Sequence, residues 1–445
     1  MKEPVFMMNI PKHIVFQVLS PIIFQIVLIG ASIKTVGDQS EDSTLTTSSV
    51  ESSNQADQAD VIPSNSASDR TLVDANTLRR KVLCGYQGWF RCPGDPAKIG
   101  WRHWSRNAKR FSPDDATFEM WPDLNEYDAD EKYPAPGFTH PDGSQAYLFS
   151  SANEKTVKRH FELMKRYDID GVFLQRFLVE LHNPSIDLVL NHVRKSAQAT
   201  GRVFAICYDL SGTPSDQIVK TIADDWKKLV DVLKIHQDKQ YLHDQNKPVV
   251  FVWGFYPDRF NARVANQVID FFTTEGPYQA TLIGGCPWYW RNEKDPEWRR
   301  VYRRFNVISP WNVGNYMTIN GRRQAATNSW KDDLITTKQA GSTFMPVIYP
   351  GFGWTNLKGK TAAGAAIPRL RGDFFKRQFQ TAAELGVQVI YVAMFDEFDE
   401  GTAILPVDSI PPVQGRFSTF EGLPPDAYLK LTHEGSQLIR RARSR

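Results

Sequence analysis

Short apolar stretches alternate with amphipathic ones along most of the chain after Lys81. The apolar stretches are rich in β-branched and aromatic residues, which is typical of strands buried on both faces of a parallel sheet. The stretches between them repeat apolar residues every three or four positions, as helices that cover such a sheet do. The predicted strands are Val82–Phe90, Gly171–Phe177, Val203–Leu210, Pro248–Phe255, Ala280–Trp288, Val307–Val313, Thr343–Phe352 and Val387–Phe395.

The helices predicted between these strands have recognisable ends. Asn153 can cap the first helix, and Gly201 and Gly386 follow the ends of two others. The predicted helices are Glu154–Tyr167, Pro184–Thr200, Pro214–Ile235, Asn261–Thr274, Pro296–Arg304, Arg322–Ala340, Arg371–Leu385 and Pro425–Arg443.

Eight strands that alternate with helices predict an α/β fold of the (β/α)8, or TIM, barrel type. A doubly wound open sheet is the alternative, although the first predicted strand lacks the glycine-rich phosphate turn that often follows it in such sheets. The stretch 91–151 is too long for a plain connection between the first two strands. We therefore expect long loops that shape a cleft on the active face of the barrel.

The N-terminus differs from the rest of the chain. Lys2 and Lys12 precede the apolar stretch Ile14–Ile29 and several small residues, the pattern of an export signal. The apolar stretch is slightly short for a transmembrane span, so an uncleaved signal anchor, which would attach the protein to a membrane, is the alternative. We expect a signal segment at 1–33, a disordered linker rich in Ser, Thr and Asp at 34–70, and one domain at 71–445 that is secreted, periplasmic or at the cell surface.

Charge and cysteine content narrow the choice of partners. The net charge is only +3 with both signs mixed, so no nucleic-acid partner is expected. Cys84, Cys92, Cys207 and Cys286 lack the spacing of a zinc site, and we expect no metal, no cofactor and a monomer. Cys84 and Cys92 could form a disulfide in an oxidising compartment, whereas Cys207 and Cys286 fit core positions on separate strands.

The last predicted strand, Val387–Phe395, runs directly into four carboxylates, Asp396, Glu397, Asp399 and Glu400. Acids crowded at the end of an apolar strand repel one another, and burial disfavours their charged forms. A solvated loop is one interpretation. Because barrel enzymes carry catalytic groups at the carboxyl ends of their strands, we favour an active site. A site for Ca²⁺ or Mg²⁺, built from the same oxygen ligands, is the second alternative.

Aromatic residues recur where the predicted strands end, and the chain contains 12 Trp. A pocket lined by Trp and Tyr with carboxylates at its floor suits a carbohydrate, either an oligosaccharide or a polysaccharide. A pair of carboxylates is also what glycoside hydrolysis requires. The candidate substrate-binding residues are Tyr86, Trp89, His103, Arg176, Tyr208, Asp209, Trp253, Tyr256, Trp311 and Tyr349, with a structural role for His103 as an equal alternative.

The motif E-F-D-E-G-T at Glu397–Thr402 resembles the E-W-H-E-G-T signature of the endo-α-mannosidases and endo-α-mannanases of glycoside hydrolase family 99. The segments Y-Q-G-W-F and W-R-H-W are similar to the family's Y-x-x-W-Y and W-x-H-W patterns. This family and the related family 71 are (β/α)8 barrels, so the resemblance implies that fold. Phe398 and Asp399 replace the Trp and His of the family motif.

The resemblance implies that Glu397 and Glu400 are catalytic and that the anomeric configuration is retained. Glu397 would act as a base on the 2-hydroxyl of the sugar to give an anhydro-sugar intermediate, and Glu400 would be the general acid/base at the glycosidic oxygen. On the third strand, A-I-C-Y-D replaces the family's H-I-E-P-type segment, so either Asp209 stands in for its glutamate or that role is lost. A non-catalytic carbohydrate-binding protein on a degenerate hydrolase barrel is the alternative.

Overall fold

The protein is represented by a computed structural model, which describes residues 72–359 and 366–442. The predicted signal segment at 1–33 and the predicted linker at 34–70 lie outside these residues. Within the described ranges, no helix is both long enough and apolar enough to cross a membrane.

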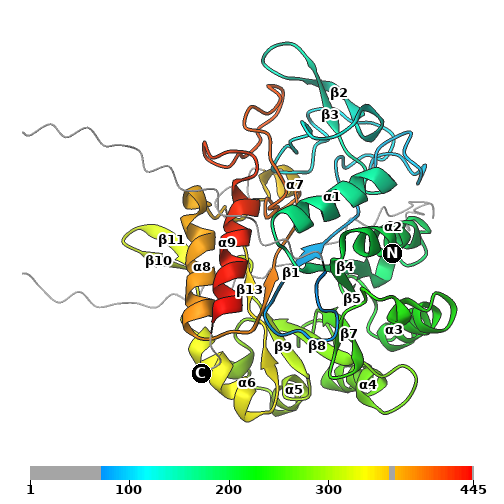
Figure 1. Cartoon of the computed structure of the whole chain (residues 1–445), viewed down its shortest axis with the longest axis vertical. Helices are drawn as coiled ribbons and strands as arrows, with labels where there is room; N and C mark the ends of the chain where they lie inside the picture. The colour runs from blue at the N-terminus through cyan, green and yellow to red at the C-terminus, as the bar shows by residue number, and fades with distance from the viewer. Residues whose placement is uncertain (1–71, 360–365, 443–445) are drawn as a thin grey trace, which may run out of the picture. The chain divides into compact units, whose positions relative to one another are not determined.

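Parallel strands form the centre of the described domain, with helices packed around them (Figure 1). The strands follow one another in the order in which they occur along the chain, as a barrel requires. In order of pairing they are β1 (Lys81–Tyr86), β4 (Gly171–Phe177), β5 (Val203–Asp209), β7 (Lys247–Trp253), β8 (Thr281–Pro287), β9 (Val307–Trp311), β12 (Thr343–Phe344), β13 (Val347–Ile348) and β14 (Val389–Val392).

The segment 343–348 closes the barrel. Its first half, β12, pairs with β9, and its second half, β13, pairs with β14. Between them, the Met345 N–H donates to the Ile308 carbonyl at 3.0 Å, and the Pro346 carbonyl accepts from the Tyr391 N–H at 3.1 Å. Since β14 also pairs with β1, the strands form a closed ring. The predicted (β/α)8 barrel is confirmed, and the open-sheet alternative is wrong.

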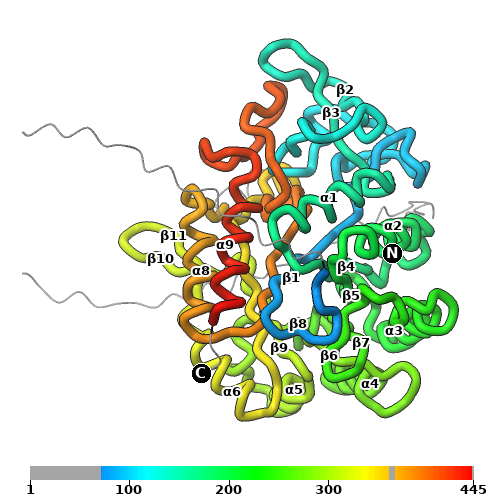
Figure 2. The backbone as a smooth tube through the Cα atoms, viewed as in Figure 1, coloured from blue at the N-terminus to red at the C-terminus, as the bar shows by residue number. Residues whose placement is uncertain are grey.

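The helices follow the predicted positions closely and surround the barrel, as the tube in Figure 2 also shows. The Asn153 side chain accepts from the Lys155 N–H at 3.0 Å, which is the predicted cap, and Gly201 ends its helix with φ 69°. The helices are α1 (Glu154–Arg166), α2 (Ser185–Thr200), α3 (Ile218–Lys227), α4 (Ala262–Thr273), α5 (Pro296–Tyr302), α6 (Trp330–Gln339), α7 (Thr355–Lys358), α8 (Asp373–Glu384) and α9 (Ala427–Arg441).

The helix predicted at Arg322–Ala340 is wrong in its first part. Residues Arg322–Ala325 form β11, which pairs antiparallel with β10 (Tyr316–Ile319). Asn320 and Gly321 connect the two strands and both have positive φ, 49° and 73°. An Asn-Gly pair favours this hairpin turn, so the signal was present in the sequence but was outweighed by the helical pattern that follows it.

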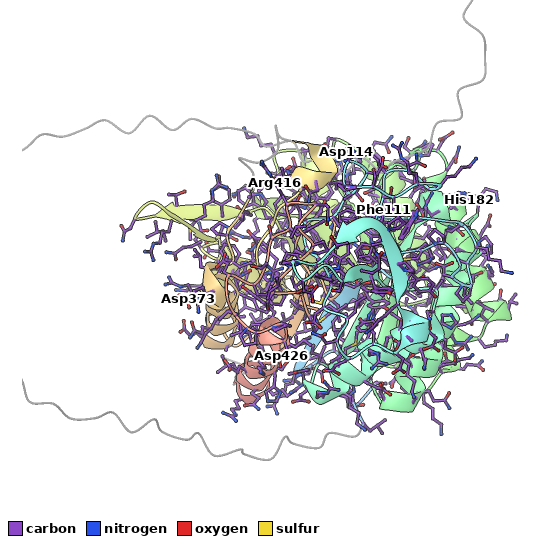
Figure 3. The ribbon with its side chains drawn as sticks, turned by 90° about the horizontal axis from the view of Figure 1, so that it is seen from above. Phe111, Asp114, His182, Asp373, Arg416 and Asp426 are labelled. Carbon is purple, nitrogen blue, oxygen red and sulfur yellow. The ribbon has the colours of Figure 1, made fainter. Side chains whose placement is uncertain are left out.

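The long stretch between β1 and β4 packs over the end of the barrel that carries the acids. It contains a hairpin of β2 (Tyr133–Thr139) and β3 (Gln145–Leu148). Further along the chain, the segment that follows the acids returns to this stretch, because the Ser418 N–H donates to the Glu119 carbonyl at 2.7 Å. Figure 3 shows this side of the molecule, where Phe111 of the long stretch and Arg416 of the later segment are labelled.

All four cysteines are free and buried, so the disulfide considered for Cys84 and Cys92 is not formed. Cys84 lies within β1, where it is paired with Val172 on one side and Val392 on the other. The Cys92 thiol instead donates to the Phe149 carbonyl at 3.2 Å. Each thiol is therefore held in its own packing environment.

Gly85 in β1 provides a test of how tightly the barrel interior is filled. A Cβ at this position would clash with Tyr391 Oη and Met394 Sδ, which lie against the backbone of β1. We expect Gly85→Val to lower the free energy of unfolding by about 1–3 kcal/mol because the interior is overpacked. Urea denaturation measures this, with Thr318→Val on the exposed strand β10 as the control. Equal stability of both variants and the parent would contradict this packing.

Candidate active site

The acidic stretch forms a tight, buried loop directly after β14. Gly401, with φ 61°, closes the turn by donating its N–H to the Phe398 carbonyl at 3.3 Å. The two arms of the loop are joined because the Met394 N–H donates to the Thr402 carbonyl at 3.2 Å. Asp396, Glu397, Asp399 and Glu400 are 0%, 2%, 4% and 7% exposed, respectively, so the solvated-loop interpretation is wrong.

Glu397 is held by hydrogen-bond donors on both carboxylate oxygens. Its Oε1 accepts from the N–H of Asp399 at 3.0 Å and from the N–H of Glu400 at 3.3 Å. Its Oε2 accepts from Nε2 of Gln87, a residue that follows β1 directly. These donors favour the charged form of Glu397, so they fix its orientation and oppose the effect of burial on its protonation.

Glu400 has the opposite environment. Its Oε1 is buried and has no hydrogen-bond partner among the described residues. Burial raises the pKa of Glu400 to about 7, with Lys358 opposing the shift and the charge of Asp209 adding to it. Burial, followed by the charges of Glu400 and Asp396, raises the pKa of Glu397 well above its usual range, so the two glutamates titrate as a pair. Three N–H donors nevertheless favour the charged form of Glu397 over that of Glu400, and on this ground we place the proton that the pair shares on Glu400.

The other two acids connect the loop to the rest of the barrel mouth. Asp396 accepts from the N–H groups of Gln87 and Gly88 at 2.7 and 2.9 Å, which fixes the chain after β1 against the acidic loop. Asp399 Oδ2 lies 2.8 Å from Nδ1 of His103. Burial, and then the charges of Arg102 and Arg91, lowers the pKa of His103 well below its usual range, so the imidazole is neutral.

These contacts bear on the metal alternative. Among the described residues, the oxygens of Asp396, Glu397, Asp399 and Glu400 do not form a group close enough together to share one ion. In the described part of the chain, carboxylate oxygens do converge at Asp128, Asp130 and Glu131. That cluster lies in the long loop, and the basic side chains of Lys155 and Arg159 already pair with it.

Aromatic residues surround the acids, but they are not equally available to a ligand. The Trp89 ring stacks on His103 with a centroid distance of 3.7 Å and packs against Phe177 at 5.2 Å, so protein already occupies its faces. Trp311, the last residue of β9, is half-buried like Trp89, and it meets Trp253 edge-on at 5.3 Å and Tyr391 at a tilt at 6.1 Å. The faces of the Trp311 ring are therefore less covered by stacked side chains than those of Trp89.

A second group of candidates lies at the ends of β5 and β7. Asp209 is 7% exposed, and burial raises its pKa to about 6. Its charge raises the pKa of Glu400, so it belongs to the same electrostatic site. The Arg259 guanidinium lies 4.6 Å from the ring centroid of Trp253 and 4.7 Å from that of Tyr256, and holds these two aromatic side chains together.

The remaining candidates are fully buried and satisfied by protein partners. Successive side chains of a strand point to opposite faces, so Arg176 and Tyr208 point outward to the helices while their neighbours Gln175 and Asp209 point inward. Arg176 pairs with Asp225 of α3 at 2.6 Å. The Tyr208 hydroxyl donates to Asp225 at 2.8 Å, and the Tyr349 hydroxyl donates to the Asn315 carbonyl at 2.7 Å. The Tyr86 hydroxyl is hydrogen-bonded to Nδ1 of His160 at 2.8 Å.

Two further residues reach the site without having been predicted. Gln87, described above, comes directly after Tyr86, the last residue of β1. Its position at a strand end could have identified it as a candidate site residue. Glu119 of the long loop is 6% exposed, and burial raises its pKa to about 7. Its N–H donates to the Phe398 carbonyl at 2.8 Å, so it packs on the acidic loop. No local pattern marks Glu119, because the folding of the long loop brings it there.

The pH dependence of stability tests the environment of Glu400. A folded-state pKa near 7, raised from an ordinary value of 4.5, contributes stability below about pH 4.5 that is lost as the pH rises through 7. Glu400→Gln removes this loss. Relative to the parent, we expect the variant to gain roughly 1–3 kcal/mol of unfolding free energy between pH 5 and pH 8, measured by urea denaturation. Glu434→Gln, at an exposed position of α9, is the control. A constant difference at both pH values would contradict the assignment.

Comparison with known proteins shows that solved structures share the fold that carries this site. No family model matches the chain, and no curated protein matches it. Among solved structures, the GH99 endo-alpha-mannosidase from Bacteroides thetaiotaomicron is similar with a TM-score of 0.61 and 18% identity, over 83% of this chain and 100% of that chain. The structure of that enzyme in complex with bis-tris-propane gives a TM-score of 0.60 and 17% identity, over 83% of this chain and 99% of that chain. The chain therefore has the barrel fold of the GH99 endo-alpha-mannosidase.

Proposed function

We propose that the protein is a glycoside hydrolase that cleaves a glycan or polysaccharide with retention of configuration. The observation that carries the proposal is the contrast between two buried glutamates on one loop. Glu397 accepts three N–H donors, whereas Glu400 Oε1 has none among the described residues. One carboxylate and one carboxylic acid, side by side, are the groups that glycoside hydrolysis uses.

Each glutamate has a defined task in the reaction. In the first step, Glu397 takes the proton of the sugar 2-hydroxyl, and the 2-oxygen attacks the anomeric carbon as the glycosidic bond breaks. Glu400 gives its proton to the leaving oxygen. In the second step, Glu400 takes a proton from water, and the water oxygen attacks the anomeric carbon. The bond between that carbon and the 2-oxygen breaks, and Glu397 returns its proton to the 2-oxygen. Two inversions at one carbon give net retention, and both glutamates regain their starting states.

The fold and the barrel mouth support a carbohydrate as the substrate. The structural neighbour is named an endo-alpha-mannosidase, so an α-mannoside is the first substrate to test. Trp288 and Tyr289, directly after β8, are 45% and 42% exposed, and Trp311 is half-buried. Exposed aromatic rings of this kind can stack on the apolar faces of sugars.

A non-catalytic binding protein is less consistent with the site. A buried carboxyl without a hydrogen-bond partner costs stability, and a protein that only binds sugar gains nothing from that cost. Glu400 Oε1 is such an atom among the described residues. Strained or unsatisfied groups of this kind are typical of catalytic sites.

Substitution of the two glutamates separates their roles. Glu400→Gln should lower kcat/KM for natural glycosides by about 10²–10⁴-fold but spare substrates with activated leaving groups, which need no acid. Glu397→Gln should lower turnover of both substrate classes, because the group that acts on the sugar is lost. Hydrolysis of mannan-type oligosaccharides and of aryl glycosides measures this, with Glu434→Gln as the control. If both variants keep the parent turnover on a substrate that the parent cleaves, the proposal is wrong.

Trp311 tests the sugar-binding wall. Trp311→Leu should weaken binding of an oligosaccharide by about 1–3 kcal/mol, a size taken from stacking of bases on aromatic rings, and should leave the melting temperature nearly unchanged. Trp330→Leu is the matched control, because Trp330 is 3% exposed and packs on Phe344. That variant should lose stability instead of affinity. A Trp311 variant that melts early and binds normally would assign this residue to the core.

A further inference from the structure

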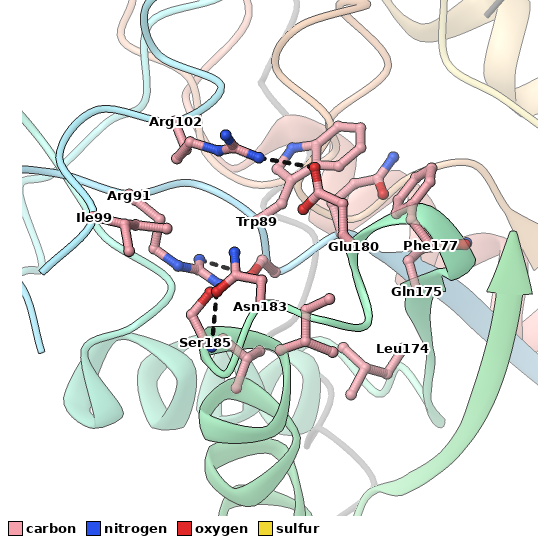
Figure 4. Close-up of a pocket in the computed structure, with 14 residues that line it drawn as sticks. Trp89, Arg91, Ile99, Arg102, Leu174, Gln175, Phe177, Glu180, Asn183 and Ser185 are labelled. Atoms are coloured by element: carbon pink, nitrogen blue, oxygen red, sulfur yellow. Dashed lines mark hydrogen bonds and ion pairs between the residues drawn. The ribbon is translucent and has the colours of Figure 1, made fainter. Parts of the chain in front are cut away.

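A pocket lies beside the acidic loop, between the ends of β1 and β4 and the start of α2 (Figure 4). Gln87 and Trp89 form the wall shared with the active site, since Gln87 donates to Glu397 and Trp89 stacks on His103. Arg91, Asn183 and Ser185 lie together on another side of the pocket. The reaction described above does not use Arg91, Asn183 or Ser185, so this side of the pocket calls for its own explanation.

Arg91 is a buried cation in the wall of this pocket, 3% exposed. One of its terminal nitrogens donates to the carbonyls of Gly88 and Phe90, both at 2.9 Å, and the other donates to Ser185 Oγ at 3.3 Å. Its Nε is buried without a partner, and no carboxylate of the described residues forms an ion pair with it. Burial lowers the pKa of Arg91 to about 10, so the guanidinium keeps its charge at neutral pH.

A buried charge is costly unless an opposite charge meets it. The acids whose charges act on Arg91 are the buried Asp95 and then Glu180, and neither forms an ion pair with the guanidinium. Asp95 accepts from the Cys92 N–H at 3.0 Å and from Ser150 Oγ at 2.6 Å, so its charge is held by these donors. Glu180 is bound by Arg102, with Nη2 and Oε1 at 2.9 Å, so this acid is already neutralised. Ser185 is the first residue of α2, a 16-residue helix, and the dipole of a helix favours an anion near its N-terminus. The Ser185 N–H itself is bonded to Asn183 Oδ1, so the helix contributes its dipole and not this donor. The residues that line the pocket therefore carry one net positive charge, from Arg91 and Arg102 against Glu180, and the nearby Asp95 opposes part of it.

We propose that this pocket binds a negatively charged substituent of the glycan, a carboxylate or a sulfate or phosphate ester, and so directs the enzyme to acidic glycans. This specificity rests on the proposed glycosidase function, whereas binding to the pocket does not. The carboxylate charge that the neighbouring loop does carry repels an anion, so the charged group fits on the Arg91 side of the wall formed by Gln87 and Trp89. The neutral part of the same glycan then faces the glutamates.

Calorimetric binding tests the pocket without any hydrolysis. The charged probes are the methyl glycosides of glucuronic, galacturonic and mannuronic acid, and the 6-sulfates and 6-phosphates of the corresponding methyl hexosides. Each charged probe is compared with its neutral methyl glycoside. The parent should bind at least one charged probe at least tenfold more tightly than its neutral counterpart. The series that binds identifies the charged group. Equal affinity for charged and neutral probes, or no binding of any charged probe, overturns the proposal.

The variant Asn183→Asp makes this test specific for the pocket. Asn183 Oδ1 accepts from the Ser185 N–H at 3.0 Å, a bond that aspartate keeps, while the new charge opposes an anion. The preference for charged probes should disappear. Asn306→Asp is the matched control, because Asn306 Oδ1 also accepts from a backbone N–H, that of Leu282 at 2.9 Å. Asn306 comes just before β9 and therefore lies at the opposite end of the barrel. A preference that survives in Asn183→Asp overturns the proposal. Replacing Arg91 itself is less informative, since its two carbonyl contacts support the fold.

Hydrolysis then separates this inference from the proposed function. An acidic polysaccharide and its carboxyl-reduced or desulfated form are compared as substrates. Cleavage of the neutral form alone would leave the glycosidase proposal standing and reject the acidic substrate. Charged probes that bind through the pocket, with no cleavage of any glycan, would support the pocket and reject the glycosidase.

Discussion

The structure depends on the burial of four carboxyl groups where β14 ends. Each unit by which burial raises a carboxyl pKa corresponds to about 1.4 kcal/mol, and burial raises the pKa values of Asp396 and Glu400 to about 7. The basic partner within ion-pair distance of the loop carboxylates, among the described residues, is His103, and burial keeps it neutral. Shared protons, and not paired basic side chains, therefore reduce the repulsion between these acids. That condition is unfavourable for stability, and it supplies an acid and a base at neutral pH.

The rest of the fold holds this loop in place. The chain after β1 donates two backbone N–H groups to Asp396, and Phe398 is buried against Phe90 and Trp104 of the first strand end and the long loop. On the other side, the buried Arg369 donates to the carbonyls of Gly401 and Ala403 at 2.8 and 2.7 Å. Rigid support of this kind explains how acids that repel one another stay close together.

The sequence was sufficient to predict the barrel and the acidic loop, because both follow from local patterns. Apolar runs separated by amphipathic stretches mark the strands and helices, and four acids after an apolar run mark the loop. Tertiary packing decided the rest. Arg176 and Tyr208 face the helices because of strand parity, which an error of one residue in the strand register reverses. Glu119 reaches the site through the folding of the long loop, which no periodicity describes.

The most direct test of the account is the protonation state of Glu400. Carbon-13 labelling of glutamate side chains allows each buried carboxyl to be followed by NMR as the pH is changed, with assignments from Glu400→Gln, Glu397→Gln and Glu119→Gln. We predict a carboxyl that titrates near pH 7, disappears in Glu400→Gln, and shifts to lower pH in Glu397→Gln because its charged neighbour is gone. A Glu400 carboxyl that titrates near its ordinary value of 4.5, as exposed glutamates do, would contradict the account.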